Sequence, residues 1–144
     1  MFDDDAFFAS LTVVEHLRMV AAAHDCVDPT SAAEHELEFF GLGTVARSVP
    51  DRLSSGQQRR LLLATALIRP STLLLLDEPE QRLDTGMRDR LIDRLRAVQE
   101  AGAVVVLTTH SAQFVSALAD IAYEVGDEPR QVSPAEAVDR MNRS

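Results

Sequence analysis

The sequence contains no lysine, so all 14 of its basic residues are arginine. This absence excludes any mechanism that needs a lysine side chain. Cys26 is the only cysteine, which excludes a disulfide within the chain and fits a reducing, cytoplasmic setting. The acidic start, Met1–Asp5, does not have the pattern of a secretory signal peptide. The longest largely apolar run, Leu61–Ile68, is far too short to span a membrane, so we expect a soluble protein without direct membrane insertion.

Positive charge is scarce overall. The chain has 23 acidic residues and a formal net charge of -9 at pH 7. Nucleic acids and anionic lipids are bound mainly through Lys and Arg, so this balance disfavours both as direct partners. The length of 144 residues and the apolar fraction of 46% are typical of a folded chain rather than a disordered one.

The apolar pattern changes along the chain from helical spacing to short continuous runs. Capping boxes at Thr12–Glu15 and Ser133–Glu136 each predict the start of a helix. Further helices are expected over residues 31–40, 57–68, 85–101 and 111–119, and strands over 73–76, 103–107 and 121–125. The first two strands are apolar throughout, as in strands buried on both faces. Alternating strands and helices predict an α/β fold with a parallel sheet, so we expect a helical subdomain (1–70) and a partial α/β core (71–144).

Two adjacent carboxylates, Asp77 and Glu78, follow the apolar run Leu73–Leu76. Ligand chemistry in parallel sheets gathers at the carboxyl ends of the strands. A carboxylate pair at that place suits a magnesium site and a base for water. Taken alone, the segment fits a solvated loop after a strand equally well.

The segment Leu53–Gln57 stands directly before an expected helix. Unpaired N–H groups and the helix dipole make such a position attractive to phosphate. Ser54 offers a hydroxyl, and Gly56 allows close backbone approach. Taken alone, Ser54 is better explained as an ordinary N-cap.

A third signal is the sequence Thr108-Thr109-His110 at the end of the second strand. A neutral imidazole there could donate to a phosphate or orient a water molecule. By itself, a lone surface histidine is the simpler interpretation.

The order of these features resembles that of the ABC ATPase family, over nearly the whole chain from Met1 to about Val125. Leu53–Gln57 resembles the signature motif of that family, usually written LSGGQ, with Ser55 where glycine is usual. Leu73–Glu78 resembles its Walker B strand. Asp84 resembles the end of its D-loop, and His110 its switch histidine. The resemblance implies a P-loop NTPase fold.

The resemblance also implies roles for these residues. Asp77 would orient Mg²⁺, Glu78 would polarise the attacking water, and His110 would contact the γ-phosphate of ATP. The four residues Ser54, Ser55, Gly56 and Gln57 would contact ATP held by the opposite subunit. Asp84 would connect the two sites of the dimer. Asp3 falls where the family has a glutamine that senses the γ-phosphate, although a carboxylate cannot donate as an amide does.

The sequence departs from the family in one major respect. The phosphate-binding loop, G-x-x-x-x-G-K-[ST], is absent, and no lysine exists to serve in it. In the family this loop and the first core strand precede residues like Met1–Thr12, so we expect an N-terminally truncated domain. Strand 103–107 would then keep an open edge, strand 121–125 would lose its neighbour, and the fold would be marginal, self-associating or completed by another chain.

Three functions remain open on these grounds. The first is an ATP-binding and ATP-hydrolysing subunit of an ABC transporter, which we expect to be inactive as this chain alone. It would use ATP and Mg²⁺, pair with a second ABC ATPase subunit and reach the membrane through a permease subunit. The second is a non-catalytic partner that lends its signature motif to a complete subunit. The third is a binding module without a nucleotide role, which Asp77, Glu78 and His110 argue against.

Overall fold

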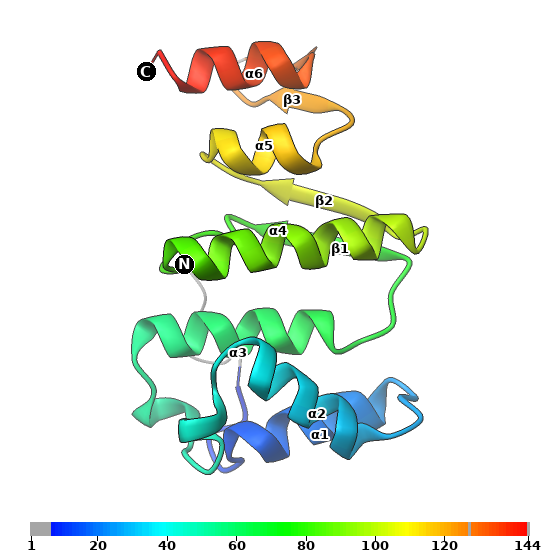
Figure 1. Cartoon of the computed structure of the whole chain (residues 1–144), viewed down its shortest axis with the longest axis vertical. Coiled ribbons are helices and arrows are strands. Elements are labelled where there is room, and N and C mark those ends of the chain that lie inside the picture. The colour runs from blue at the N-terminus through cyan, green and yellow to red at the C-terminus, as the bar shows by residue number, and fades with distance from the viewer. Residues whose placement is uncertain (1–6, 127, 144) are drawn as a thin grey trace. The chain divides into compact units, whose positions relative to one another are not determined.

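The computed structural model describes residues 7–126 and 128–143. The chain separates into two compact units, Met1–Ser71 and Thr72–Ser144. Figure 1 shows that the first unit is helical and that the labelled strands belong to the second. Asp3 lies outside the described residues, so its predicted role has no structural description.

The first unit is built on helices α1 (Val13–Ala23), α2 (Pro29–Phe39) and α3 (Ser55–Leu67), with short 3-10 helices η2 (Gly43–Val45) and η3 (Pro50–Arg52) between the last two. The capping box predicted at Thr12 is confirmed: its backbone N–H donates to the Glu15 carboxylate at 2.8 Å. Leu17 and Leu37 are buried on α1 and α2, which pack against each other.

Helix α2 begins earlier than predicted. Its N-cap is Asp28, whose carboxylate accepts from the backbone N–H groups of Thr30 and Ser31 at 3.1 Å each. Pro29 then occupies the first helical position, where its missing N–H costs nothing. Gly41 ends the helix as predicted, because its φ of 63° is a conformation that favours glycine.

The second unit contains β1 (Leu73–Asp77), α4 (Thr85–Glu100), β2 (Val104–Thr108), α5 (Ala112–Leu118), β3 (Ala122–Glu124), β4 (Arg130–Val132) and α6 (Pro134–Met141). Strands β1 and β2 pair in parallel, as predicted. Within the described residues, β3 pairs with β4 in an antiparallel hairpin and does not extend the parallel sheet. Strand β4 was not predicted, because residues 128–132 contain a single β-branched residue, Val132, and carry no strand pattern.

Salt bridges join the hairpin to the last helix. The Glu124 carboxylate accepts from Arg130 at 2.8 Å and is also paired with Arg140 of α6. The hydrogen bond from Arg130 is the main reason that the pKa of Glu124 lies below its usual value. The capping box predicted at Ser133 is confirmed at the start of α6.

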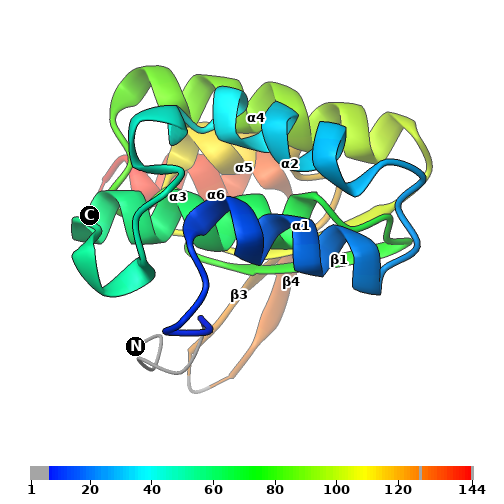
Figure 2. The same ribbon diagram turned by 90° about the horizontal axis from the view of Figure 1, so that it is seen from below.

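The expectation that β1 and β2 are buried on both faces is wrong for this chain. Leu74 is 4% exposed, whereas Leu73 and Leu75 are 53% and 67% exposed. Val104 and Val106 of β2 are exposed in the same way. Figure 2 shows α4 and α5 on one side of the two strands, so one face of the sheet is covered and the other keeps its apolar side chains in solvent.

A buried histidine lies in the first unit. The His16 side chain is 2% exposed, and neither ring nitrogen has a hydrogen-bond partner among the described residues. The rings of Phe7 and Phe8 lie 5.5 and 6.0 Å from its ring. Burial disfavours the charged imidazolium and therefore lowers the pKa of His16.

We predict that the first unit loses stability as the pH falls below about 6.5, the ordinary pKa of an unfolded histidine. Because the folded-state pKa is lower, the unfolded chain takes up a proton first, so stability is complete above this value and declines between it and the folded-state pKa. Urea unfolding of the first unit, followed at pH 7.5 and pH 5.5, measures the change. His16→Leu should remove it, and an undiminished pH dependence in that variant would contradict the assignment.

We also predict that the exposed face of the parallel sheet promotes self-association. Leu75→Thr keeps a good strand former and removes apolar surface, so it should lower the association constant. Sedimentation velocity over a range of protein concentrations measures this. Val27→Thr is the matched control, because Val27 is fully exposed in the other unit. An equal effect of both substitutions would show that the sheet face has no special part.

Candidate nucleotide site

The ends of the two parallel strands lie side by side. Asp77 ends β1, Thr108 ends β2, and the two residues are partners in the strand register. The Thr108 hydroxyl donates to the Asp77 carboxylate. The same hydroxyl oxygen accepts from the Glu78 backbone N–H at 3.1 Å, and the Thr108 carbonyl oxygen accepts from it at 3.0 Å. Three hydrogen bonds thus fix where the chain leaves β1.

Glu78 and His110 meet at this edge of the sheet. His110 Nε2 lies 3.1 Å from Glu78 Oε1, so the imidazole and the carboxylate are in direct contact. The His110 side chain is 90% exposed, whereas that of Glu78 is 26% exposed. Asp77 ends β1, Glu78 follows it, and His110 lies in the loop after β2, so the three residues lie at the strand ends where the sequence analysis placed them, and their catalytic roles stay predictions.

The backbone of Glu78 has an unusual conformation. Its φ is 42°, in the left-handed region that costs a non-glycine residue about 1 kcal/mol. The two hydrogen bonds from its N–H to Thr108 hold it there. Backbone strain of this kind persists only where the surrounding structure enforces it. In this conformation, the Glu78 side chain contacts His110 in the loop after β2.

The loop between β1 and α4 is anchored at both ends. Pro79 and Leu83 are buried. Asp84 is the N-cap of α4 and accepts from the Met87 backbone N–H at 2.9 Å. Asp84 therefore caps α4 in the structure. Its role in connecting the two nucleotide sites of a dimer stays a prediction.

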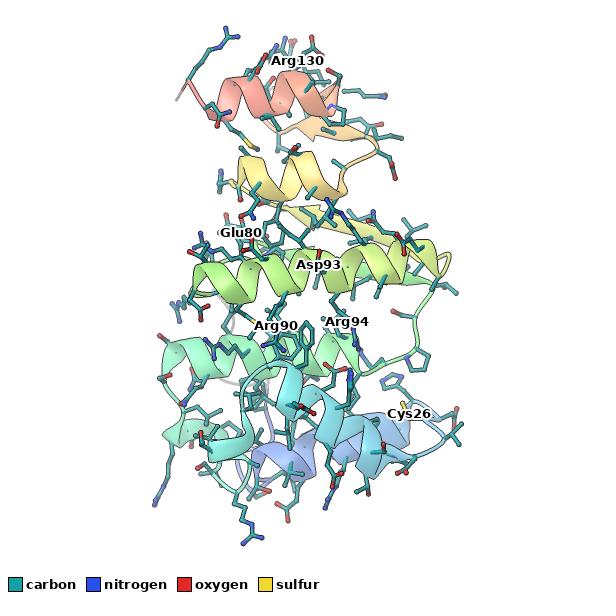
Figure 3. The ribbon with its side chains drawn as sticks, in the orientation of Figure 1. Cys26, Glu80, Arg90, Asp93, Arg94 and Arg130 are labelled. Carbon is teal, nitrogen blue, oxygen red and sulfur yellow. The ribbon has the colours of Figure 1, made fainter. Side chains whose placement is uncertain are left out.

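A second glutamate, Glu80, lies in the same loop and is labelled in Figure 3. Its side chain is 7% exposed. Glu80 Oε1 accepts from the Thr109 hydroxyl and from the His110 backbone N–H, the latter at 3.2 Å. This carboxylate therefore links the loop after β1 to the loop after β2.

The four residues of the serine-glycine segment belong to the first unit. Helix α3 starts at Ser55 rather than at Gln57, because Ser54 and Gln57 form a capping box. The Ser54 N–H donates to the Gln57 side-chain oxygen at 2.9 Å, and the Gln57 N–H donates to the Ser54 hydroxyl at 3.3 Å. Ser54 and Ser55 are exposed, and Gly56 lies in the first turn. The N-cap interpretation of Ser54 is confirmed, and phosphate binding at this end stays a prediction.

A magnesium ion fits Asp77 only as part of a shared site. In the described ranges, no group of three or more His, Cys, Asp or Glu side chains could hold a metal ion on its own. Magnesium is commonly held by one or two carboxylates together with water and substrate phosphates. One carboxylate at the strand end is consistent with that chemistry.

Sequence reasoning missed three participants: Thr108, Thr109 and Glu80. The signal in the sequence is that two threonines end one apolar run and acidic residues end the other. The parallel register of the two strands then places the hydroxyl of Thr108 beside Asp77. Because the register could not be read from the sequence, these contacts could not be predicted from it.

Comparisons with known proteins agree with this arrangement. The family described as "AAA domain, putative AbiEii toxin, Type IV TA system" matches residues 27–116, more than half of the chain. The aliphatic sulfonates import ATP-binding protein SsuB 1 of Paracoccus denitrificans is 36% identical over 83% of this chain and 49% of its own length. The chain thus spans about half the length of this curated relative.

Solved structures share the fold. The ATP-binding subunit of an ABC transporter superimposes with a TM-score of 0.77 over 94% of this chain and 64% of its own length, at 21% identity. A bacterial ABC transporter cassette solved as a dimer gives a TM-score of 0.67 over 78% of this chain and 52% of its own, at 25% identity. No helix in the described part of the chain has the length and apolar character needed to cross a membrane.

The matching family defines the class of protein, an AAA domain, and the solved structures show that this chain has part of a P-loop NTPase fold. The chain belongs to this AAA family, and in sequence and fold it is similar to ATP-binding proteins of ABC transporters.

We predict that Thr108→Val lowers the free energy of unfolding of the second unit by about 1 kcal/mol, because valine keeps the shape and loses the hydroxyl bonds to Asp77 and Glu78. Thr108→Ser, which keeps the hydroxyl, should recover most of the loss. Chemical denaturation followed by circular dichroism measures both variants. Equal stability of the valine variant and the unaltered chain would show that the hydroxyl contributes nothing.

Proposed function

We propose that this chain is the ATP-binding part of an ABC transporter subunit, and that it hydrolyses ATP only when a phosphate-binding loop is supplied from outside these residues. The observation that carries the proposal is the 3.1 Å contact between Glu78 and His110 at the ends of two paired strands. It puts a base and a hydrogen-bond donor within reach of one reacting group, as phosphoryl transfer to water requires.

Each residue at the ends of β1 and β2 has a separate role in the proposed hydrolysis of ATP. Glu78 accepts a hydrogen bond from the attacking water and polarises it. The Nε2–H of His110 donates to Glu78 and, with nucleotide present, to the γ-phosphate. Asp77 is the carboxylate that would help to hold Mg²⁺, which neutralises phosphate charge when it is bound with ATP.

The N-terminus of α3 serves the second site of a dimer. Ser54, Ser55, Gly56 and Gln57 contact the phosphates of ATP held by the opposite subunit, where the helix dipole and backbone N–H groups favour negative charge. Asp84 connects the two sites across the dimer. Asp3 stands in the place of the phosphate-sensing glutamine and, as a carboxylate, can only accept hydrogen bonds.

The proposed partners follow from the relatives. A second ABC ATPase subunit completes each nucleotide site, in line with the cassette that was solved as a dimer. A transmembrane permease subunit holds the assembly at the cytoplasmic face of the membrane, since the similar Paracoccus protein is named for import.

A second function has one specific observation in its favour. Ser54 and Ser55 are exposed at the start of α3, and their capping box is complete within the first unit. The chain could therefore act as a non-catalytic partner that lends this end to a complete subunit with its own phosphate-binding loop.

We predict that this chain alone shows no binding of Mg²⁺-ATP by calorimetry near neutral pH, because neither a lysine nor a glycine-rich cradle is present to hold the phosphates. Micromolar binding would mean that the phosphates are held by other groups and would overturn the dependence on an external loop.

The two functions separate in a reconstituted complex with a subunit that carries a phosphate-binding loop. Glu78→Gln keeps the size of the side chain and removes the base. If Glu78 of this chain is the base, this substitution should lower the ATPase activity of the sites that contain it by about a hundredfold or more, which would support the catalytic function. Unchanged activity, together with a loss on Ser54→Ala, supports the lending function. If neither substitution changes activity, both proposals fail.

A further inference from the structure

The buried carboxylate of Glu80 makes contacts that helix capping and apolar packing do not explain. Its side chain is 7% exposed, yet it bonds neither to its own loop's backbone nor to an arginine in the contacts described. Its Oε1 atom accepts both hydrogen bonds, and its buried Oε2 has no partner among the described residues. Burying a carboxylate costs free energy unless it is hydrogen-bonded. We therefore ask what the hydrogen bonds of Glu80 hold in place.

Both bonds of Glu80 go to the segment that carries His110. The Thr109 hydroxyl and the His110 backbone N–H converge on Oε1. The Thr109 hydroxyl oxygen in turn accepts from the Ser111 backbone N–H at 2.9 Å. One carboxylate oxygen therefore holds Thr109 and His110 directly after β2, and the Thr109 hydroxyl in turn holds Ser111.

The ring of His110 has little else to hold it. Its side chain is 90% exposed, so packing does not select its orientation. Glu78 contacts the ring and Glu80 contacts the backbone, and only Pro79 separates the two glutamates. Proline has a fixed φ and Pro79 is buried, so the spacing between these two contacts is rigid.

We propose that Glu80 is a positioning residue that sets His110 against Glu78. The inference deepens the proposed function and rests on it, because it explains how the donor of the γ-phosphate contact is held ready before nucleotide arrives. The acceptor must be charged or strongly polar, since one oxygen takes two donors. Glutamine would keep this oxygen, whereas alanine would remove it.

The test uses the whole chain, without nucleotide, and NMR signals of His110. In Glu80→Ala, the backbone amide of His110 should exchange with solvent about tenfold faster or more, because it loses a bond to a charged acceptor. The ¹⁵N shifts of its ring should move from the Nε2–H form toward a mixture of tautomers. Glu80→Gln should stay close to the unaltered chain in both signals.

Controls separate positioning from general stability. Glu100→Ala removes an exposed carboxylate at the end of α4, and the amide of Leu91 within α4 reports opening of the whole unit. Faster exchange at His110 with unchanged exchange at Leu91 supports the proposal. Unchanged His110 signals in Glu80→Ala, or equal acceleration at both amides, would overturn it.

If Glu80→Ala does not fold, Thr109→Val and Thr109→Ser decide the question. Valine removes the hydroxyl that bonds to Glu80 and should loosen His110, whereas serine should preserve it. Identical His110 signals in both variants would overturn the proposal. Because no ATP is present, failure of the ATPase experiment would sink the proposed function and leave this measurement unaffected.

Discussion

The last pair in the parallel register, Asp77 opposite Thr108, is the constraint on which the candidate site depends. Parallel pairing brings both strand ends to one edge, and the Thr108 hydroxyl then bonds to Asp77 and to the backbone of Glu78. A shift by one residue would turn every side chain of a strand to the opposite face. The position of the carboxylates thus follows from the register.

In the second unit, the hydrogen bonds of the candidate site and the apolar packing of the sheet differ in whether they are complete within the unit. The site is ordered by hydrogen bonds within two short loops, so it requires only that β1 and β2 stay paired. The packing of the sheet is incomplete, because Leu75 and Val106 on its uncovered face are exposed to solvent. Burying this face would stabilise the unit without changing a contact among Glu78, Glu80 and His110. The exposed sheet face therefore affects stability without a part in the site geometry, whereas the Thr108 hydroxyl contributes to both.

The sequence was informative where a local signal decides the structure. Capping boxes at Thr12 and Ser133, the glycine at position 41 and the apolar runs of β1 and β2 each predicted an element that the structure contains. Prediction failed where the outcome depends on tertiary contacts: the exposed face of the sheet, the polar strand β4, and the bonds of Thr109 and Glu80. The left-handed φ of Glu78 had no sequence signal, because glycine or asparagine is the usual mark of that conformation.

The first unit raises a different physical question, which is how a helix end that is already capped could also accept a phosphate, as we propose for the N-terminus of α3. In the structure, Ser54 and Gln57 satisfy each other, so the start of α3 is stable without a ligand. The Gln57 N–H bond to the hydroxyl is long, at 3.3 Å, and a serine cap contributes only about 1 kcal/mol. A phosphate carries several charged acceptors and can replace that bond with stronger ones. The exposed cap therefore protects the helix end in the free chain and presents only a small barrier to an anion that docks on it.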